Sequence, residues 1–206
     1  IQVAPYGPSF LPRDSDDIPV SMQDQVQKAV DCYNAGATVL HVHVREADGA
    51  GSKRLEMFDE MLDRLRTAVP KMIMQVGGSI SFAPKDDGDG SAKWLSDDTR
   101  HMLAELNPKP DQVTIAINTN QMNVMELITP DDCAGTSMGE PDYTKAYTEM
   151  YYESGPAFVK EHLKRLQAAG IQPHFQIGSI KDLETVERIV RAGQYMGPYV
   201  LNWVSI

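Results

Sequence analysis

Short apolar runs alternate along the chain with longer amphipathic segments. The runs predict six strands, at Ile1–Ala4, Thr38–Val44, Met72–Val76, Gln112–Ile117, Gln172–Ile177 and Tyr199–Val204. The segments between them predict helices, at Ser21–Ala35, Leu55–Ala68, Asp97–Leu106, Ala157–Ala169 and Lys181–Ala192. Three of these helices end in an Ala-Gly pair, which suits the left-handed residue that often closes a helix. The alternation predicts serial βα units that build a parallel sheet.

Such units form either an open doubly wound sheet or a (β/α)8 barrel. The nucleotide-binding open sheet carries a G-x-G-x-x-G turn after its first strand, and the segment APYGPSF lacks it. Strand side chains alternate between two faces, and the polar ones share one face: His41, His43, Arg45, Gln75, Gly77, Ser79, Thr114, Asn118, Gln176 and Asn202. A polar inner set favours a barrel interior. We therefore predict one domain over residues 1–206, a (β/α)8 TIM barrel with about its first six βα units present and its C-terminal strands absent.

Two connections depart from the short loops of such a barrel, and nothing in the sequence predicts a hairpin. Asn118–Pro156 follows the fourth strand, at the end where barrel enzymes carry their sites. Tyr143, Tyr147 and Tyr151 recur there at helical spacing, which predicts either a packing or subunit-contact helix or a substrate lid. The acidic, glycine-rich segment Ala83–Lys93 predicts a mobile surface loop.

Composition narrows the classes of function. Of the 206 residues 42% are hydrophobic, too many for a disordered chain, and no apolar stretch approaches the roughly 18–20 residues of a membrane span. The N-terminal segment IQVAPYG has no signal-peptide pattern. A net charge of −10 disfavours nucleic acid and anionic membranes as partners. Cys32 and Cys133 fit no disulfide or metal spacing, so we expect a cytoplasmic protein.

The pattern His41-Val42-His43 at the end of the second strand is the strongest chemical feature. Alternation puts both imidazoles on one face, about 7 Å apart at Cα, where they can bind one divalent ion such as Zn²⁺. The alternative is a pair of histidines hydrogen-bonded within a polar core. Metal-dependent amidohydrolases carry this motif on their first strand, so that class is disfavoured.

A catalytic zinc usually takes three protein ligands. His101 and His162 lie in predicted helices, and His174 opens the fifth strand at the bottom of the barrel. These positions make all three poor candidates. We therefore expect the third ligand beyond Ile206.

The segments VLHVHVREADG, IPVSMQDQ, PDQVTIAIN, AAGIQPHFQI and GPYVLNWVSI resemble, in order and spacing, the β-keto acid cleavage enzymes, which include 3-keto-5-aminohexanoate cleavage enzyme. The resemblance implies a (β/α)8 barrel that binds a divalent metal, usually zinc, through His41, His43 and a later glutamate. It implies the conversion of a β-keto acid and acetyl-CoA into acetoacetate and a new acyl-CoA. It also implies a homo-tetramer, and a substrate contact at Thr114.

The remaining inner residues are candidates for substrate binding. The inner polar side chains are expected to position the substrate carboxylate by hydrogen bonds, namely Thr114, Asn118, Ser79 and Gln75. The Gly77 turn offers backbone amides to an anion. Arg45 either neutralises a carboxylate or is fixed in an ion pair.

Two further functions stay open. Ser9 and Gln176 stand near positions where the family carries acidic residues, which favours a barrel that binds a small carboxylic acid or an acyl-CoA without turnover. A metal-dependent aldolase is the third possibility, and dependence on CoA separates it from the first.

Overall fold

The computed structural model describes residues 1–7, 10–77, 82–83, 93–94, 97–148 and 150–204. Six parallel strands form one sheet in the order β1-β2-β3-β6-β9-β10. They are β1 (Gln2–Val3), β2 (Val39–Val42), β3 (Ile73–Val76), β6 (Gln112–Ala116), β9 (Gln172–Ile177) and β10 (Val200–Trp203), each within a predicted strand. Every strand pairs with the next one of the series, whereas the strand order of a doubly wound sheet reverses at a switch point. The six strands therefore form a half-barrel.

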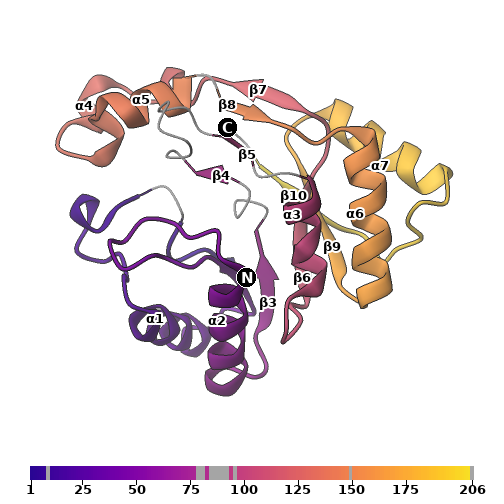
Figure 1. The fold of residues 1–206 in the computed structure, drawn as a ribbon, viewed down its shortest axis with the longest axis horizontal. Helices are drawn as coiled ribbons and strands as arrows, with labels where there is room; N and C mark the ends of the chain where they lie inside the picture. The colour runs from indigo at the N-terminus through magenta and orange to yellow at the C-terminus, as the bar shows by residue number, and fades with distance from the viewer. Residues whose placement is uncertain (8–9, 78–81, 84–92, 95–96, 149, 205–206) are drawn as a thin grey trace.

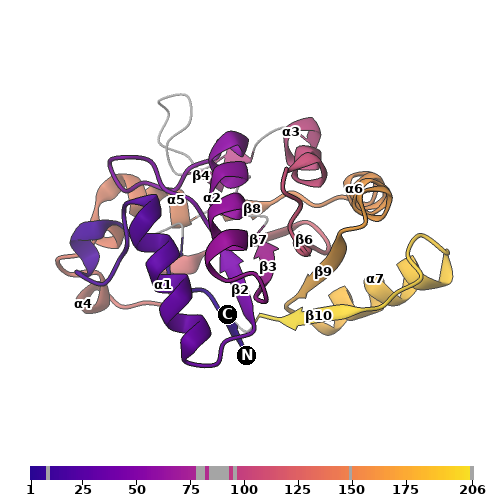
Figure 2. The same ribbon diagram turned by 90° about the horizontal axis from the view of Figure 1, so that it is seen from below.

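The predicted helices connect these strands. They are α1 (Met22–Asn34), α2 (Leu55–Ala68), α3 (Asp97–His101) with the 3-10 helix η3 (Met102–Glu105), α6 (Pro156–Ala169) and α7 (Ile180–Arg191). Figures 1 and 2 show that they follow one another around the sheet. Their ends obey the expected signals: the Ser21 side chain accepts a hydrogen bond from the Asp24 amide at 3.1 Å, and Gly170 closes α6 with φ 72°.

The apolar face of the strands packs against these helices. Leu40, Val42, Met74 and Val113 form one buried cluster with side chains of α2. Ile115, Ile117, Phe175 and Ile177 form a second cluster with side chains of α6 and α7. Burying one such side chain stabilises the fold by about 1.5–3 kcal/mol, which is what fixes strand parity. The opposite face of the same strands is left to the polar residues.

Residues 119–155, called the insertion below, separate β6 from α6. They form β7 (Asn120–Met122), η4 (Val124–Glu126), α4 (Pro130–Cys133), η5 (Ser137–Gly139), α5 (Pro141–Thr148) and β8 (Met150–Tyr152). In Figure 1 α4 and α5 lie above the indigo N-terminal loops, away from α6 and α7.

The tyrosine helix of the insertion is shorter than the spacing predicts. Tyr143 and Tyr147 lie in α5 with their ring centroids 6.2 Å apart, and both are buried in a cluster with Cys133 and Met138. The prediction that this helix continues to Tyr151 is wrong, because Tyr151 lies in β8, opposite Gln121 of β7. Strand pairing has overridden local spacing at this position.

The structure also contains antiparallel strand pairs that no signal in the sequence predicted. The pair β7-β8 is antiparallel, as is a second pair formed by β4 (Phe82–Ala83) and β5 (Lys93–Trp94). Most of the predicted mobile loop, residues 84–92, lies outside the described residues. Among the helices that the structure describes, none is both long and apolar enough to cross a bilayer.

A buried histidine pair joins α3 to α6. Nδ1 of His101 lies 3.2 Å from Nδ1 of His162, and the two residues are 4% and 2% exposed. Phe158 stacks on both imidazoles, with centroid distances of 4.8 and 5.2 Å. Burial, with added repulsion from His101, Arg100 and Arg165, lowers the pKa of His162 to about 3. Both histidines thus lie in helices, as predicted, and serve to pack them together.

This packing predicts a loss of stability in acid. The unfolded chain takes up a proton on His162 near pH 6.5, whereas the folded protein resists it down to about pH 3, so stability falls as the pH drops through that window. Between pH 7 and pH 5 the contribution of His162 is about 2 kcal/mol. Urea unfolding at the two pH values is expected to show a smaller difference for His162→Asn than for the wild type. Equal differences would contradict the assignment.

Candidate metal and substrate site

The two histidines of the H-x-H pattern share the polar face of the half-barrel. The ring centroids of His41 and His43 are 4.6 Å apart, with an angle of 71° between the ring planes. His43 is 5% exposed and His41 is partly buried. Their place at the carboxyl end of β2 is where barrel enzymes position catalytic groups.

A hydrogen-bonded row crosses four strands from His41. In the strand register Gln75 of β3 lies opposite His41, and His174 of β9 lies opposite Thr114 of β6. Nδ1 of His41 contacts Oε1 of Gln75, and Nε2 of Gln75 donates to Oγ1 of Thr114. Oγ1 of Thr114 lies 3.4 Å from Nδ1 of His174. The row thus joins imidazole, amide, hydroxyl and imidazole in sequence.

The amide of Gln75 determines which nitrogen of His41 carries the proton. Its Nε2 also donates to the Val76 carbonyl at 3.0 Å, and because a carbonyl only accepts, this contact fixes the orientation of the amide. Oε1 therefore faces His41, so Nδ1 must be the donor. This leaves the lone pair on Nε2 of His41, which is the nitrogen available to a metal.

The electrostatic environment keeps these rings neutral. Burial lowers the pKa of His41, although the hydrogen bond to Gln75 opposes this shift. Burial lowers the pKa of His43 further, and the neighbouring His41 and Arg45 add to the effect. Metal ligands must be deprotonated imidazoles, and these two already are at neutral pH.

Within the described ranges, no group of three or more His, Cys, Asp and Glu side chains is arranged to hold a metal. His41 and His43 fit two positions of a ligand set by their burial and neutrality, and His41 also by its fixed tautomer. His174 differs from the expectation that it lies at the bottom of the barrel, because it belongs to the polar row. Burial lowers the pKa of His174 too, and the neighbouring His41 imidazole adds to this shift.

Asn118 departs from the predicted inner set. Its backbone is left-handed, with φ 67°, and its side chain is hydrogen-bonded to α7. Nδ2 of Asn118 donates to Asp182 at 2.7 Å, and Thr185 donates to Oδ1 of Asn118 at 3.1 Å. The strand itself ends two residues earlier, at Ala116, and the substrate contact of Asn118 stays a prediction.

The other predicted substrate residues have separate outcomes. Thr114 is buried within the polar row, and Gly77 is buried directly after β3. Ser79 lies outside the described residues. Gln176 and Asn202 pair with one another across β9 and β10, on the face predicted for them.

Arg45 binds the segment between β1 and α1, called the N-terminal loop below. It forms no ion pair among the described residues. Its guanidinium donates to the carbonyls of Phe10 at 2.7 Å and Gly49 at 2.5 Å, and also to the Gly7 carbonyl. The side chain is 4% exposed. This arrangement favours the fixed, structural role that the sequence left open, with backbone carbonyls in place of a carboxylate.

The same loop binds the insertion. Asp14 accepts hydrogen bonds from the amide of Ser137 at 2.6 Å and from its hydroxyl at 2.5 Å. Arg13 forms a salt bridge with Glu140 at 2.5 Å. Burial alone would raise the pKa of the Asp14 carboxyl, but the hydrogen bonds from Ser137 and Leu11 outweigh it and lower this pKa. The insertion is thereby connected, through the loop and Arg45, to the strand that carries the histidines.

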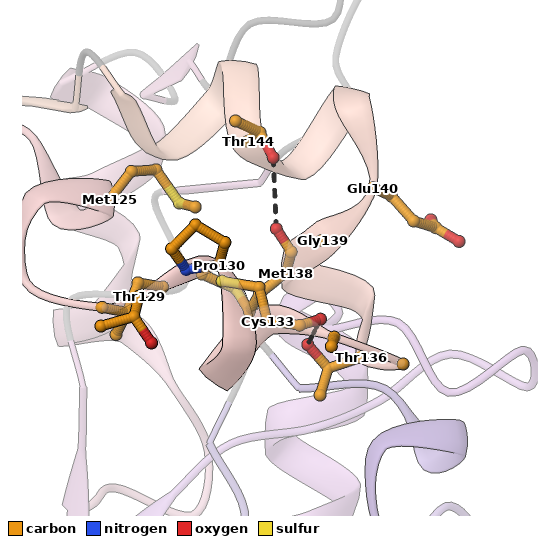
Figure 3. A pocket seen from close by; sticks show the side chains of 12 residues that line it. Met125, Thr129, Pro130, Cys133, Thr136, Met138, Gly139, Glu140 and Thr144 are labelled. Atoms are coloured by element: carbon orange, nitrogen blue, oxygen red, sulfur yellow. Dashed lines mark hydrogen bonds between the residues drawn. The ribbon is translucent and has the colours of Figure 1, made fainter.

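A cavity of about 490 Å³ lies within the insertion (Figure 3). Met125, Pro130 and Met138 give it apolar walls, and the buried thiol of Cys133 lies beside them. Hydroxyls of Thr144 and Thr136 donate to main-chain carbonyls at its edge. No residue predicted to bind metal or substrate lines it.

A parallel half-barrel with imidazole, amide and hydroxyl groups gathered on its polar face belongs to the class of barrel enzymes. Residues 1–205 match the family model of the beta-keto acid cleavage enzymes, and the chain belongs to this family.

Curated relatives carry related names. The chain is 22% identical over 199 residues to the 3-dehydrocarnitine:acetyl-CoA trimethylamine transferase of Rhizobium meliloti, an alignment covering 91% of this chain and 58% of that protein. It is 31% identical over 88 residues to the 3-keto-5-aminohexanoate cleavage enzyme of Acetoanaerobium sticklandii, an alignment covering 42% of this chain and 32% of that protein. It is 34% identical over 89 residues to the 3-oxoadipate:acetyl-CoA acetyltransferase of Cupriavidus necator, an alignment covering 43% of this chain and 31% of that protein. The chain thus spans only part of each relative.

Solved structures of ObcA share the fold. The structure with a C4-CoA adduct and oxalate superposes with a TM-score of 0.60 at 13% identity, over 89% of this chain and 36% of that one. The structure with oxaloacetate also has a TM-score of 0.60, at 12% identity.

The contact between Asp14 and Ser137 predicts how the insertion is held. Asp14→Ala leaves the Ser137 amide without its partner, and we expect a loss of about 1–3 kcal/mol in unfolding free energy. Hydrogen–deuterium exchange, measured by mass spectrometry, should be faster at the amides of η5 and α5 in this variant. Asp16→Ala, an exposed carboxylate of the same loop, is the matched control. Unchanged exchange in Asp14→Ala would show that the insertion is held elsewhere.

Proposed function

We propose that this protein acts in a metal-dependent exchange of acyl groups between a β-keto acid and acetyl-CoA, releasing acetoacetate and a new acyl-CoA. The observation that supports it most is the neutral pair His41 and His43, with the Nδ1 proton of His41 committed to Gln75. In the whole protein we place this half-barrel within a closed (β/α)8 barrel, where a glutamate completes the ligand set. Membership in the family supports the acyl chemistry.

The reaction exchanges bonds without a change of oxidation state. The bond between the keto carbon and the α-carbon of the β-keto acid breaks, as does the C–S bond of acetyl-CoA. The α-carbon forms a new bond to the acetyl carbonyl carbon, which yields acetoacetate, and the CoA sulfur bonds to the departing acyl carbon. No net proton is taken up or lost.

His41 and His43 would hold the divalent ion, Zn²⁺ by resemblance. Such an ion supplies Lewis-acid stabilisation of the negative charge that develops on the substrate oxygens. Gln75 fixes the ring of His41 through its amide oxygen. Because Thr114 already accepts a hydrogen bond from Gln75, its own proton is free for donation to His174 or to a substrate oxygen.

A barrel that binds a small carboxylic acid or an acyl-CoA without turnover is the second candidate. A neutral amide at Gln176, within the polar face of β9, favours it, because the resemblance places an acidic group there. Ligand binding without release of acetoacetate would select this function. Aldol cleavage that needs no CoA would instead select an aldolase.

The acidic net charge and the two free cysteines support a cytoplasmic location. We further propose a homo-tetramer, on the family resemblance. Sedimentation of the full-length protein measures its assembly directly.

Loss of either histidine is expected to remove the metal. In His41→Ala and His43→Ala, metal measured by mass spectrometry after dialysis should fall to background. Loss of a residue that only hydrogen-bonds a metal ligand lowers activity by roughly 10–100-fold. Formation of acetoacetate from a β-keto acid and acetyl-CoA should fall by more than this in both alanine variants. His162→Asn, at a buried histidine far from β2 in the sequence, should keep both metal and activity. Metal retained in both alanine variants would refute the ligand assignment.

Gln75 is expected to act on the metal through His41. Gln75→Leu removes the acceptor that sets the tautomer, and we expect metal affinity to fall by about 10–100-fold in competition with a chromophoric chelator. Thr114→Val keeps the contact between Gln75 and His41, so metal affinity should stay while the KM for the β-keto acid rises. Equal loss of metal affinity in the two variants would contradict this division of roles.

A further inference from the structure

A groove of about 470 Å³ lies between α7 and the point where the insertion leads into α6. Figure 1 shows α6 and α7 side by side at this edge of the molecule. The polar residues that line the groove are Asn118, Thr119, Ser154, Lys181, Thr185, Arg188 and Gln194. The two charged side chains among its lining residues are both cations.

One face of α7 supplies both cations. Lys181 and Arg188 are seven residues apart, about 10 Å along the helix axis, with Thr185 between them. Arg188 donates to the Thr185 hydroxyl at 2.7 Å, and within the described part of the chain no carboxylate lies within salt-bridge distance of either cation. The nearby Glu187 is instead paired with Arg191 at 2.6 Å. Two unneutralised cations in one groove stand out in a chain of net charge −10.

The opposite wall adds hydrogen-bond donors. The 14-residue helix α6 begins at this wall, its N-cap Gly155 provides no side-chain cap, and its first turn has no acidic residue. The first amides of a helix lack partners within it and attract anions. Pro156, the first residue of α6, has no amide proton, so the amides of Ala157 and Phe158 are the donors that this end adds to the two cations on α7.

One wall of the groove is hydrogen-bonded to the end of β6, the strand that carries Thr114. The Ser154 hydroxyl donates to the Ala116 carbonyl at 2.6 Å, and the Ser154 amide donates to Thr119 at 3.0 Å. Ala116 ends β6, two residues after Thr114, on the same face of the strand. Ser154 and Thr119 therefore place this wall of the groove at the carboxyl end of β6.

We propose that this groove binds the phosphate groups of the CoA thioester, with Lys181 and Arg188 as their cationic partners. The inference rests on the proposed function, in which a CoA thioester is a substrate. The pantetheine arm of that molecule separates the reactive thioester from the phosphates, so the phosphates bind at a site apart from the polar row. Loss of one charge-assisted contact of this kind typically weakens binding by about tenfold or more.

Calorimetric titration of the full-length protein with CoA tests the proposal. We expect Lys181→Gln and Arg188→Gln each to weaken CoA binding by at least about tenfold. Lys160→Gln, which removes one exposed positive charge from α6 outside the groove, should leave the affinity unchanged. Pantetheine, which lacks the phosphates, should bind equally to all four proteins.

The outcomes separate this inference from the proposed function. CoA binding that is unaffected in both groove variants overturns the groove and leaves the acyl chemistry standing. Inorganic pyrophosphate that binds at Lys181 and Arg188 while CoA does not would overturn the assignment to CoA. Weakened CoA binding in a protein that cleaves no β-keto acid would support the groove and reject the proposed reaction.

Discussion

The amide of Gln75 is the constraint on which the candidate site depends. The Val76 carbonyl fixes the position of the amide nitrogen, so the amide oxygen faces His41. The same nitrogen also donates to Thr114. One neutral side chain thereby sets a tautomer on β2 and orients a hydroxyl on β6. Because the amide is fully buried, water does not compete for these contacts, and each stays directional.

The packing of the half-barrel makes this row possible. Strand alternation sends Leu40, Val42 and Val76 to the helices and leaves His41, His43 and Gln75 on the opposite face. Arg45, the next residue of that series, holds the N-terminal loop by its carbonyls. The loop in turn binds the insertion through Asp14. The histidine strand, the loop and the insertion are thus one connected structure around the carboxyl end of β2.

The sequence predicts the strands, the helices and the polar face well, because burial fixes the period of each element. It does not predict the left-handed backbone of Asn118, which breaks the alternation. It also does not predict that Tyr151 lies in a strand that pairs with β7. The place of His174 in the row and the contact between Asp14 and Ser137 depend on strand register and on long-range packing. Residues 123 positions apart leave no local signal of their contact.

The central claim is that His41 and His43 share one divalent ion, with His41 bound through Nε2. Anomalous diffraction from crystals of the full-length protein, recorded at the absorption edge of its native metal, tests this most directly. The account predicts one peak about 2.0–2.2 Å from Nε2 of His41 and from a ring nitrogen of His43, with Nδ1 of His41 still on Gln75. A peak elsewhere, or both rings hydrogen-bonded to protein groups with no ion between them, would contradict it.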